Sequence, residues 1–333
     1  MTHNDPVDQP LRVSIPDGIL TLIPYLAGYH PANRIAAVLA DAHTVQTVAC
    51  SELGEPQLLP RLLDCARRHH LSTVFLAIYS PLDGAADLLR TLGEALRAEG
   101  LTLLAQVQVN RGHRRVIYAE QGGCGPWQPI EHDTVIAAQM VAHGRVALAD
   151  RDELIARFAP TTGTARDTIR LITAELDRFW AQQRERDAEA AHDSLRAVGL
   201  RYLDRIDEHV QDPSQHLDFD DRDVAQLGIS LRDVAVRDGA AERVGRDGVS
   251  YQQVWIEIMR RVDHADRPAP ATIAALASWR CGDAMSAGLA VGQALDADPT
   301  YRLARLLQAA LAANLPAPSW SELTGSTTEL DQH

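Results

Sequence analysis

Over the first 160 residues, the apolar positions alternate between a strand-like and a helix-like period. The segment 74–79 (VFLAIY) is apolar throughout, which is typical of a strand covered on both faces of a sheet. The segment 82–98 carries apolar residues three or four positions apart and ends before Gly100, a residue type that often terminates helices. This pattern predicts an α/β domain over residues 1–160, a mixed sheet covered by helices. Further strands are expected at 11–15, 35–39, 44–49, 101–109 and 114–118, and further helices at 17–26 and 58–66.

Beyond residue 160 the strand signals stop, and the pattern predicts an all-helical domain over residues 161–318 and a flexible tail over residues 319–333. A breaker-rich stretch, Pro160–Gly163, precedes a capping-box-like pair formed by Thr164 and Asp167. Two apolar stripes follow at helical spacing: Ile169, Ile172, Leu176 and Phe179, then Leu195, Val198, Leu203 and Ile206.

The two stripes are separated by a charged stretch, residues 182–187, that is polar on every side. A helix of this kind usually crosses solvent between packed regions. We therefore expect one continuous helix that connects two bodies, with the first stripe packed on the α/β domain and the second packed within the helical domain or against a partner. Later helices are expected at 220–236, 249–263, 270–281, 283–296 and 299–313.

The segment 279–311 carries the clearest supersecondary signal in the chain. Gly282, Ala287, Ala294 and Pro299 follow the small-residue spacing of a tetratricopeptide-like helix pair. No second copy precedes it, so a repeat array is not expected. Such pairs usually serve packing, and those with a binding function take peptides.

The net charge of −13 arises from 45 acidic against 32 basic residues, and every basic residue apart from histidine is an arginine. Nucleic-acid binders need a basic face, so we expect no nucleic-acid partner. No apolar run approaches the ~18 residues that a membrane span requires, and no secretion signal is recognisable at the N-terminus. We therefore expect a cytoplasmic protein without a membrane partner.

The four cysteines, Cys50, Cys65, Cys124 and Cys281, lie far apart and lack metal-ligand spacing. We expect reduced thiols that form no disulfide and bind no metal. No phosphate-binding glycine loop and no HExxH or GxSxG motif occurs, so no cofactor is expected. The acidic run 218–223 is interpreted as a helix cap at Asp220 or Asp221.

Two stretches concentrate residues that can carry chemistry. In IPYLAGYHP, residues 23–31, Tyr25, Tyr29 and His30 gather where a helix ends at Gly28, which favours a structural turn over a reactive cluster. In EQGGCGPWQP, residues 120–129, the sequence looks like the region around the nucleophile of papain-like cysteine proteases. Pro126 stands where that motif has its catalytic cysteine, so a loop that returns Cys124 and Trp127 to the sheet is expected.

Three stretches together resemble an actinobacterial family named as domain of unknown function number 4192. They are IPYLAGYHP, RVALADRDELIARFAP at 145–160, and the end segment WRCGD…ALDADPTYRLARLL from Trp279. The resemblance runs from about residue 11 to 316. It implies a cytoplasmic α/β-plus-helical protein and transfers neither an activity nor a catalytic residue. The family's loop after the hairpin usually holds several cysteines, of which only Cys124 is present here.

We expect a non-catalytic interaction or scaffold module that binds a protein partner through its helical half. The alternative is a small-molecule-binding or hydrolytic α/β protein with a pocket where three segments converge. Those segments are Tyr25–His30, Ser80–Asp83 and Cys124–Trp127. The candidate pocket residues are Tyr25, Tyr29, His30, Ser80, Asp83, Cys124 and Trp127.

Overall fold

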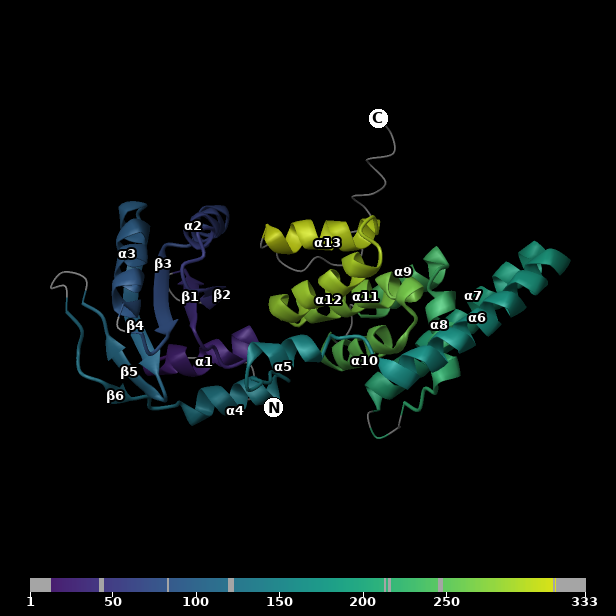
Figure 1. Ribbon diagram of the computed structural model, residues 1–333, viewed down its shortest axis with the longest axis horizontal. Coiled ribbons are helices and arrows are strands. Elements are labelled where there is room, and N and C mark those ends of the chain that lie inside the picture. The colour runs from purple at the N-terminus through teal and green to yellow at the C-terminus, as the bar shows by residue number, and fades with distance from the viewer. Residues whose placement is uncertain are drawn as a thin grey trace, which may run out of the picture. The chain divides into compact units, whose positions relative to one another are not determined.

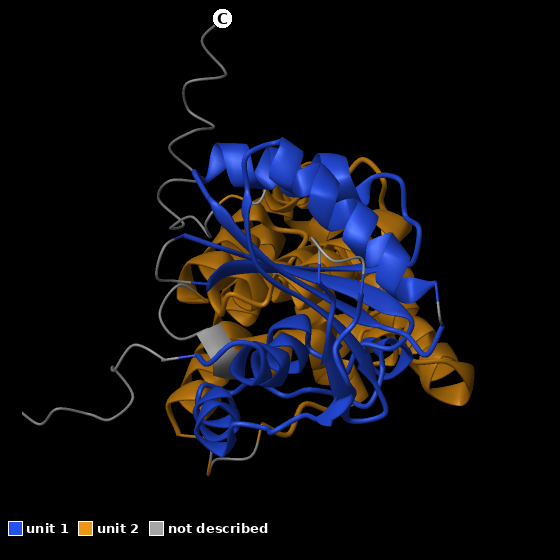
Figure 2. Ribbon diagram, turned by 90° about the vertical axis from the view of Figure 1, so that its left-hand side faces the viewer, with its two compact units in different colours: residues 1–154 blue, residues 155–333 orange. Residues whose placement is uncertain are grey.

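The chain divides into two compact units, residues 1–154 and 155–333, each with its own core (Figure 2). The sequence pattern placed this division at residue 160. The computed structural model describes residues 13–315 except 42–44, 83, 119–122, 213, 215–216, 245–247 and 314. The predicted tail and the candidate residue Asp83 lie outside the described residues.

A mixed sheet forms the centre of the first unit, in the order β2-β1-β3-β4-β5-β6. Strands β3 and β4 are parallel and all other neighbours are antiparallel. This confirms the predicted mixed sheet, while the short strand β6 was not predicted. The strands are β1 (Arg34–Ala40), β2 (Val45–Glu52), β3 (Thr73–Tyr79), β4 (Thr102–Asn110), β5 (His113–Val116) and β6 (Gln128–Pro129).

Helices cover both faces of this sheet (Figures 1 and 2). Successive residues of β1 point to opposite faces: Ile35 packs against the core of α2 (Leu58–Arg68) and α3 (Ala85–Ala98), and Ala36 packs against that of α1 (Asp17–Ala27). Helix α4 (Thr134–Ala142) packs on α1, and α5 (Arg151–Ala156) follows it along the chain.

The turn at the end of α1 follows the prediction, because Gly28 has a φ of +79° and ends the helix in the left-handed conformation. The strand predicted at 11–15 is wrong in its described part, since Val13 and Ser14 are not in a strand. The Ser14 side chain instead accepts a hydrogen bond from the Gly18 amide at the start of α1. At the same end of the helix, Arg114 of β5 donates two hydrogen bonds to Asp17, at 2.5 and 2.9 Å.

The described residues of the second unit form helices and the segments that connect them, without a strand (Figure 1). Helix α11 forms its centre: every residue from Pro268 to Trp279 is buried, and α10 and α12 pack against it. The helices are α6 (Gly163–Arg186), α7 (Ala188–Gln211), α8 (Asp221–Ser230), α9 (Val234–Arg243), α10 (Gly248–Arg261), a short 3₁₀ turn (His264–Asp266), α11 (Pro268–Arg280), α12 (Ala284–Ala297) and α13 (Arg302–Ala312).

The prediction of one continuous connecting helix is wrong. The helix breaks at Asp187, whose φ of −157° and ψ of 104° are extended, and whose side chain caps α7 by accepting a hydrogen bond from the Ala190 amide. Helix α6 packs on α7, α8 and α10 within its own unit. The first apolar stripe therefore belongs to the helical core, and Phe179 at its end is 47% exposed.

Two further helix boundaries differ from the prediction. The segment 220–236 forms two helices, because Asp233 starts α9 by accepting a hydrogen bond from the Ala235 amide. Helix α6 begins at Gly163 after Thr162, so Thr164 is not a helix cap. Asp220 does cap α8, accepting from the Asp223 amide as expected. In the segment proposed as tetratricopeptide-like, Ala287 and Ala294 are fully buried, and that assignment stays a prediction.

No helix in the described part of the chain is long and apolar enough to span a bilayer.

Candidate functional site

The candidate pocket residues of the first unit divide between the two faces of the sheet. The side chain of the candidate Tyr29 interacts with Cys50, which packs with Tyr79 against the core on the α1 face. Cys124 packs against the core on the α2–α3 face. Tyr29 of the first predicted segment and Cys124 of the third therefore lie in two separate clusters, one on each face.

The end of IPYLAGYHP is fixed by the segment that follows α4. The amide of His30 donates to the carbonyl of Leu148, and the amide of Leu148 donates to the carbonyl of Gly28, both at 2.9 Å. This bridge places Tyr29 in the interior, at 1% exposure, whereas Tyr25 is half-buried and His30 is exposed. Although His30 as a residue is exposed, partial removal of its ring from water, with a smaller contribution from His132, lowers its pKa.

The cluster on the α1 face contains three weakly acidic groups, Tyr29, Cys50 and Tyr79, whose pKa values are all raised. Burial raises the pKa of the Tyr29 hydroxyl to about 12 and that of the Cys50 thiol to about 11. Burial also raises the pKa of Tyr79. A protonated thiol is a poor nucleophile, so this arrangement does not prepare Cys50 for covalent chemistry.

On the α2–α3 face, a chain of polar contacts joins Ser80 to Trp127. The Gln108 side-chain nitrogen donates to the carbonyl of Ser80 at 2.9 Å, and its oxygen accepts two hydrogen bonds from Arg115 at 2.7 and 2.9 Å. The Arg115 guanidinium stacks on the Trp127 ring, 4.8 Å from its centroid, and Trp127 is 41% exposed. This chain lies at the carboxyl end of β3, where open α/β sheets often bind ligands.

The second unit carries a groove of about 440 Å³ along α7. Its described lining residues come from one side of this helix, because most of them are spaced three or four positions apart. They combine an apolar residue, an aromatic ring and both signs of charge: Val198, Arg201, Tyr202, Asp204, Arg205 and Glu208.

Aromatic and charged contacts hold the wall of this groove in place. The Arg205 guanidinium stacks on Phe219, 4.5 Å from its ring centroid, and lies 5.6 Å from that of Tyr202. The Tyr202 hydroxyl donates a 2.8 Å hydrogen bond to Asp223 of α8. Burial and this hydrogen bond raise the pKa of Tyr202 to about 12, so the hydroxyl stays a donor at neutral pH.

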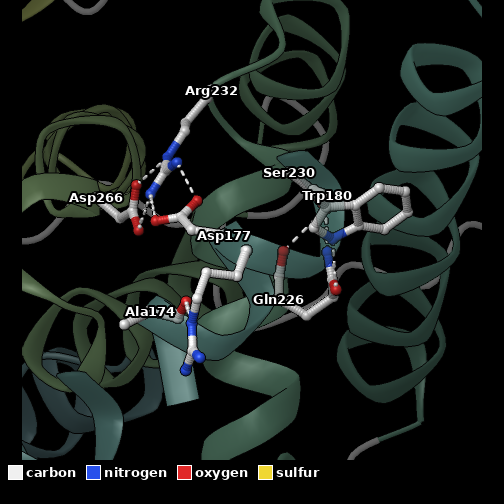
Figure 3. A network of polar contacts seen from close by, with 8 residues as sticks. Ala174, Asp177, Trp180, Gln226, Ser230, Arg232 and Asp266 are labelled. Atoms are coloured by element: carbon white, nitrogen blue, oxygen red, sulfur yellow. Dashed lines mark hydrogen bonds and ion pairs between the residues drawn. The ribbon is translucent and has the colours of Figure 1, made fainter. Parts of the chain in front are cut away.

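A buried polar network elsewhere in this unit joins α6 to α8 (Figure 3). The Trp180 indole nitrogen donates to the Gln226 side-chain oxygen at 3.1 Å, and the Gln226 nitrogen reaches the Ser230 hydroxyl at 3.4 Å. Close by, Arg232 donates to Asp177 of α6 and to Asp266, whose side chain is 2% exposed. Burial opposes the charge of Arg232, but its bonds to Asp266 and Asp177 outweigh burial and raise its pKa.

All four cysteines lie among the described residues, and none of them forms a disulfide. Within the described ranges, no group of three or more histidine, cysteine or acidic side chains is arranged to hold a metal ion.

Sequence reasoning missed Gln108, Arg115 and the lining of the α7 groove. Gln108 and Arg115 are direct cross-strand partners in the β4–β5 hairpin, so the alternation of that hairpin was a usable signal for the first pair. The groove residues have no comparable signal, because an exposed face rich in charge is typical of many solvated helices.

Comparison with known proteins gives a family but no activity. No curated protein matches the chain, and no solved structure matches it. The model of the family described as Domain of unknown function (DUF4192) matches residues 16–317, which cover most of both units and the groove on α7. The chain therefore belongs to this family.

Proposed function

We propose that this protein is a non-catalytic, cytoplasmic interaction module that binds a protein partner through the α7 groove of its helical unit. The observation that carries the proposal is the composition of that groove. Arginine and tyrosine are enriched where binding energy concentrates in protein interfaces, and Arg201, Tyr202 and Arg205 lie together here. The adjacent carboxylate of Glu208 favours a partner segment that itself carries both signs of charge, whereas the Asp204 carboxylate is already paired with Arg243 at 2.7 Å.

The groove is also held in shape before any partner binds. Tyr202 is tied to Asp223, and Arg205 is stacked on Phe219, which is itself buried. Side chains that are already ordered lose less entropy when a complex forms. The net charge of −13 supports a protein rather than a nucleic acid as the partner.

The first unit supports the non-catalytic half of the proposal. The pKa values of Cys50 and Tyr29 are raised to about 11 and about 12, away from neutral pH, where a nucleophile or a general base would have to act. The raised values fit groups that pack in a core.

A charge reversal in the groove tests the proposal. Arg201→Glu should reduce the recovery of co-purifying proteins from native lysate at least about tenfold, because it places a carboxylate opposite the acidic group that Arg201 would bind in the partner. The matched control is Arg170→Glu on α6, an exposed arginine that pairs with nearby Asp167 at 3.4 Å, which should recover the same partners as the parent protein. Circular dichroism establishes that both variants are folded. Identical partner profiles for parent and Arg201→Glu would exclude the α7 groove as the binding surface.

The second candidate is a small-molecule-binding or hydrolytic α/β protein, which the Arg115–Trp127 stack beside Ser80 favours. Native mass spectrometry of the purified protein distinguishes the two candidates. A bound low-mass compound that is lost in Arg115→Ala supports this second candidate, whereas a protein partner lost in Arg201→Glu supports the first.

A further inference from the structure

Two charged side chains on the wall of the α7 groove have no partner among the residues that the structure describes. Arg201 and Glu208 are both exposed, and neither forms a hydrogen bond or an ion pair with a described side chain. The other two charged residues of the groove, Asp204 and Arg205, both have partners within their own unit. Among the described lining residues, one cation and one anion are thus available to a partner.

These two charges lie two turns apart on one side of α7. Seven residues advance an α-helix by about 10 Å and return it to nearly the same side. Charged pairs on a helix form three or four residues apart, so Arg201 and Glu208 do not neutralise each other. A partner that matches both of them must present an acid and a base at the same spacing, in the opposite order along the groove.

A second α7 that runs antiparallel to the first has this pattern, because its Glu208 faces Arg201 while its Arg201 faces Glu208. In this register the two-fold axis passes between Asp204 and Arg205, so these opposite charges of the two copies also face each other. A shift of three residues would bring Asp204 against Glu208 in one direction, and Arg201 against Arg205 in the other. A parallel arrangement would bring Arg201 against its own copy. Like charges in contact oppose these other arrangements.

We propose that the partner of the α7 groove is a second copy of this chain, bound through an antiparallel contact in which Arg201 of each copy pairs with Glu208 of the other. The inference rests on the proposed function, since it names the partner of the same groove. Each contact occurs twice, as a two-fold interface requires. A single polar helix face gives a small interface, so the dimer depends on protein concentration and weakens at high salt.

Sedimentation velocity on the full chain, over micromolar to millimolar concentration, tests this contact through a charge swap. Arg201→Glu and Glu208→Arg should each weaken dimerisation at least about tenfold, because each places like charges at both copies of the contact. An equimolar mixture of the two variants should dimerise nearly as well as the parent protein, since a copy with two acidic residues then meets a copy with two basic ones. The control is Arg170→Glu on α6, which should dimerise as the parent protein does.

Both substituted positions are exposed, so the fold should be retained, and circular dichroism checks this. A parent protein that is monomeric at every concentration, or single variants that dimerise as the parent protein does, overturns the inference. A mixture that associates no better than its two components also overturns it. The proposed function can fail or hold separately: a monomeric protein whose capture of a different protein is lost in Arg201→Glu retains the α7 groove as a binding surface and excludes the second copy as its partner.

Discussion

At the scale of single residues, Tyr29 shows how burial makes stability depend on pH. Its ring is 1% exposed, and burial raises the pKa of its hydroxyl to about 12, above the ordinary value of 10.0. In the unfolded chain this group ionises near its ordinary value. The stability that it contributes is therefore complete below about pH 10 and is lost as the pH rises toward 12.

Tyr29→Phe removes this titration. Two pKa units correspond to roughly 2–3 kcal/mol, so the variant should retain about that much more of its neutral-pH stability than the parent protein at pH 12. At pH 7 the two proteins should unfold within about 1 kcal/mol of each other, since the ring still fills the same space. Urea unfolding at both pH values measures the difference. An equal loss of stability in both proteins at high pH would show that Tyr29 does not remain protonated in the fold.

Much of the local structure around the candidate residues follows from residue type. Gly28 ends α1 with a positive φ, and Asp220 caps α8, as the sequence indicates. The full chain of contacts from Ser80 to Trp127 could not be predicted, because the hairpin alternation indicates the Gln108–Arg115 pair but nothing in the sequence places Trp127 on Arg115. Residue type sets caps and turns, whereas side-chain networks depend on tertiary register.

At the scale of helices, the sequence contains a signal for the break between α6 and α7, namely the aspartate at position 187. The prediction of one helix followed the apolar spacing instead and missed this signal. Aspartate is a preferred helix cap, and Asp187 caps α7 through the Ala190 amide. The polar residues before it were interpreted as a solvent-crossing stretch of one helix. Helix α4 was missed for a different reason: a largely apolar sequence without a polar face gives no periodicity, so a helix cannot be distinguished from a strand.

The close approach of α7 to α8 and α9 at Gly199 leads to a testable prediction. A Cβ atom at Gly199 would lie 2.7 Å from a methyl carbon of Val236 and 2.8 Å from the Cβ of Ser230. Gly199→Ala should therefore destabilise the protein by about 1–3 kcal/mol, although alanine is the better helix former.

The matched control is Gly288→Ala in α12, where a Cβ would meet no atom within 4 Å. That substitution should be neutral or should stabilise by up to about 1 kcal/mol. Chemical denaturation of the two variants against the parent protein measures both effects. Equal stability changes at the two positions would mean that α7 does not approach α8 and α9 as closely as the structure shows.

At the scale of the whole molecule, the position of the boundary between the units follows from backbone hydrogen bonds. The breaker cluster near residue 160 marks a change of character, but it already belongs to the helical unit. The Arg260 side chain donates to the Ala159 carbonyl at 3.0 Å, and the Thr161 amide donates to the Arg260 carbonyl at 2.9 Å. Leu154, in contrast, faces Gly28 of the first unit.

The chain should therefore divide into two self-sufficient parts near residue 156 rather than after the breaker cluster. We expect fragments 1–156 and 157–333 to unfold cooperatively on their own, because each retains its core and its terminal contacts. A fragment that begins at residue 163 should be less stable than 157–333 by about 2 kcal/mol or more, since it lacks buried Phe158 and leaves the Arg260 carbonyl without the Thr161 amide. Urea unfolding followed by circular dichroism measures all three. Equal stability of the two helical fragments would place residues 157–162 outside the helical unit, and a fragment 1–156 without a cooperative transition would mean that the first unit depends on the second.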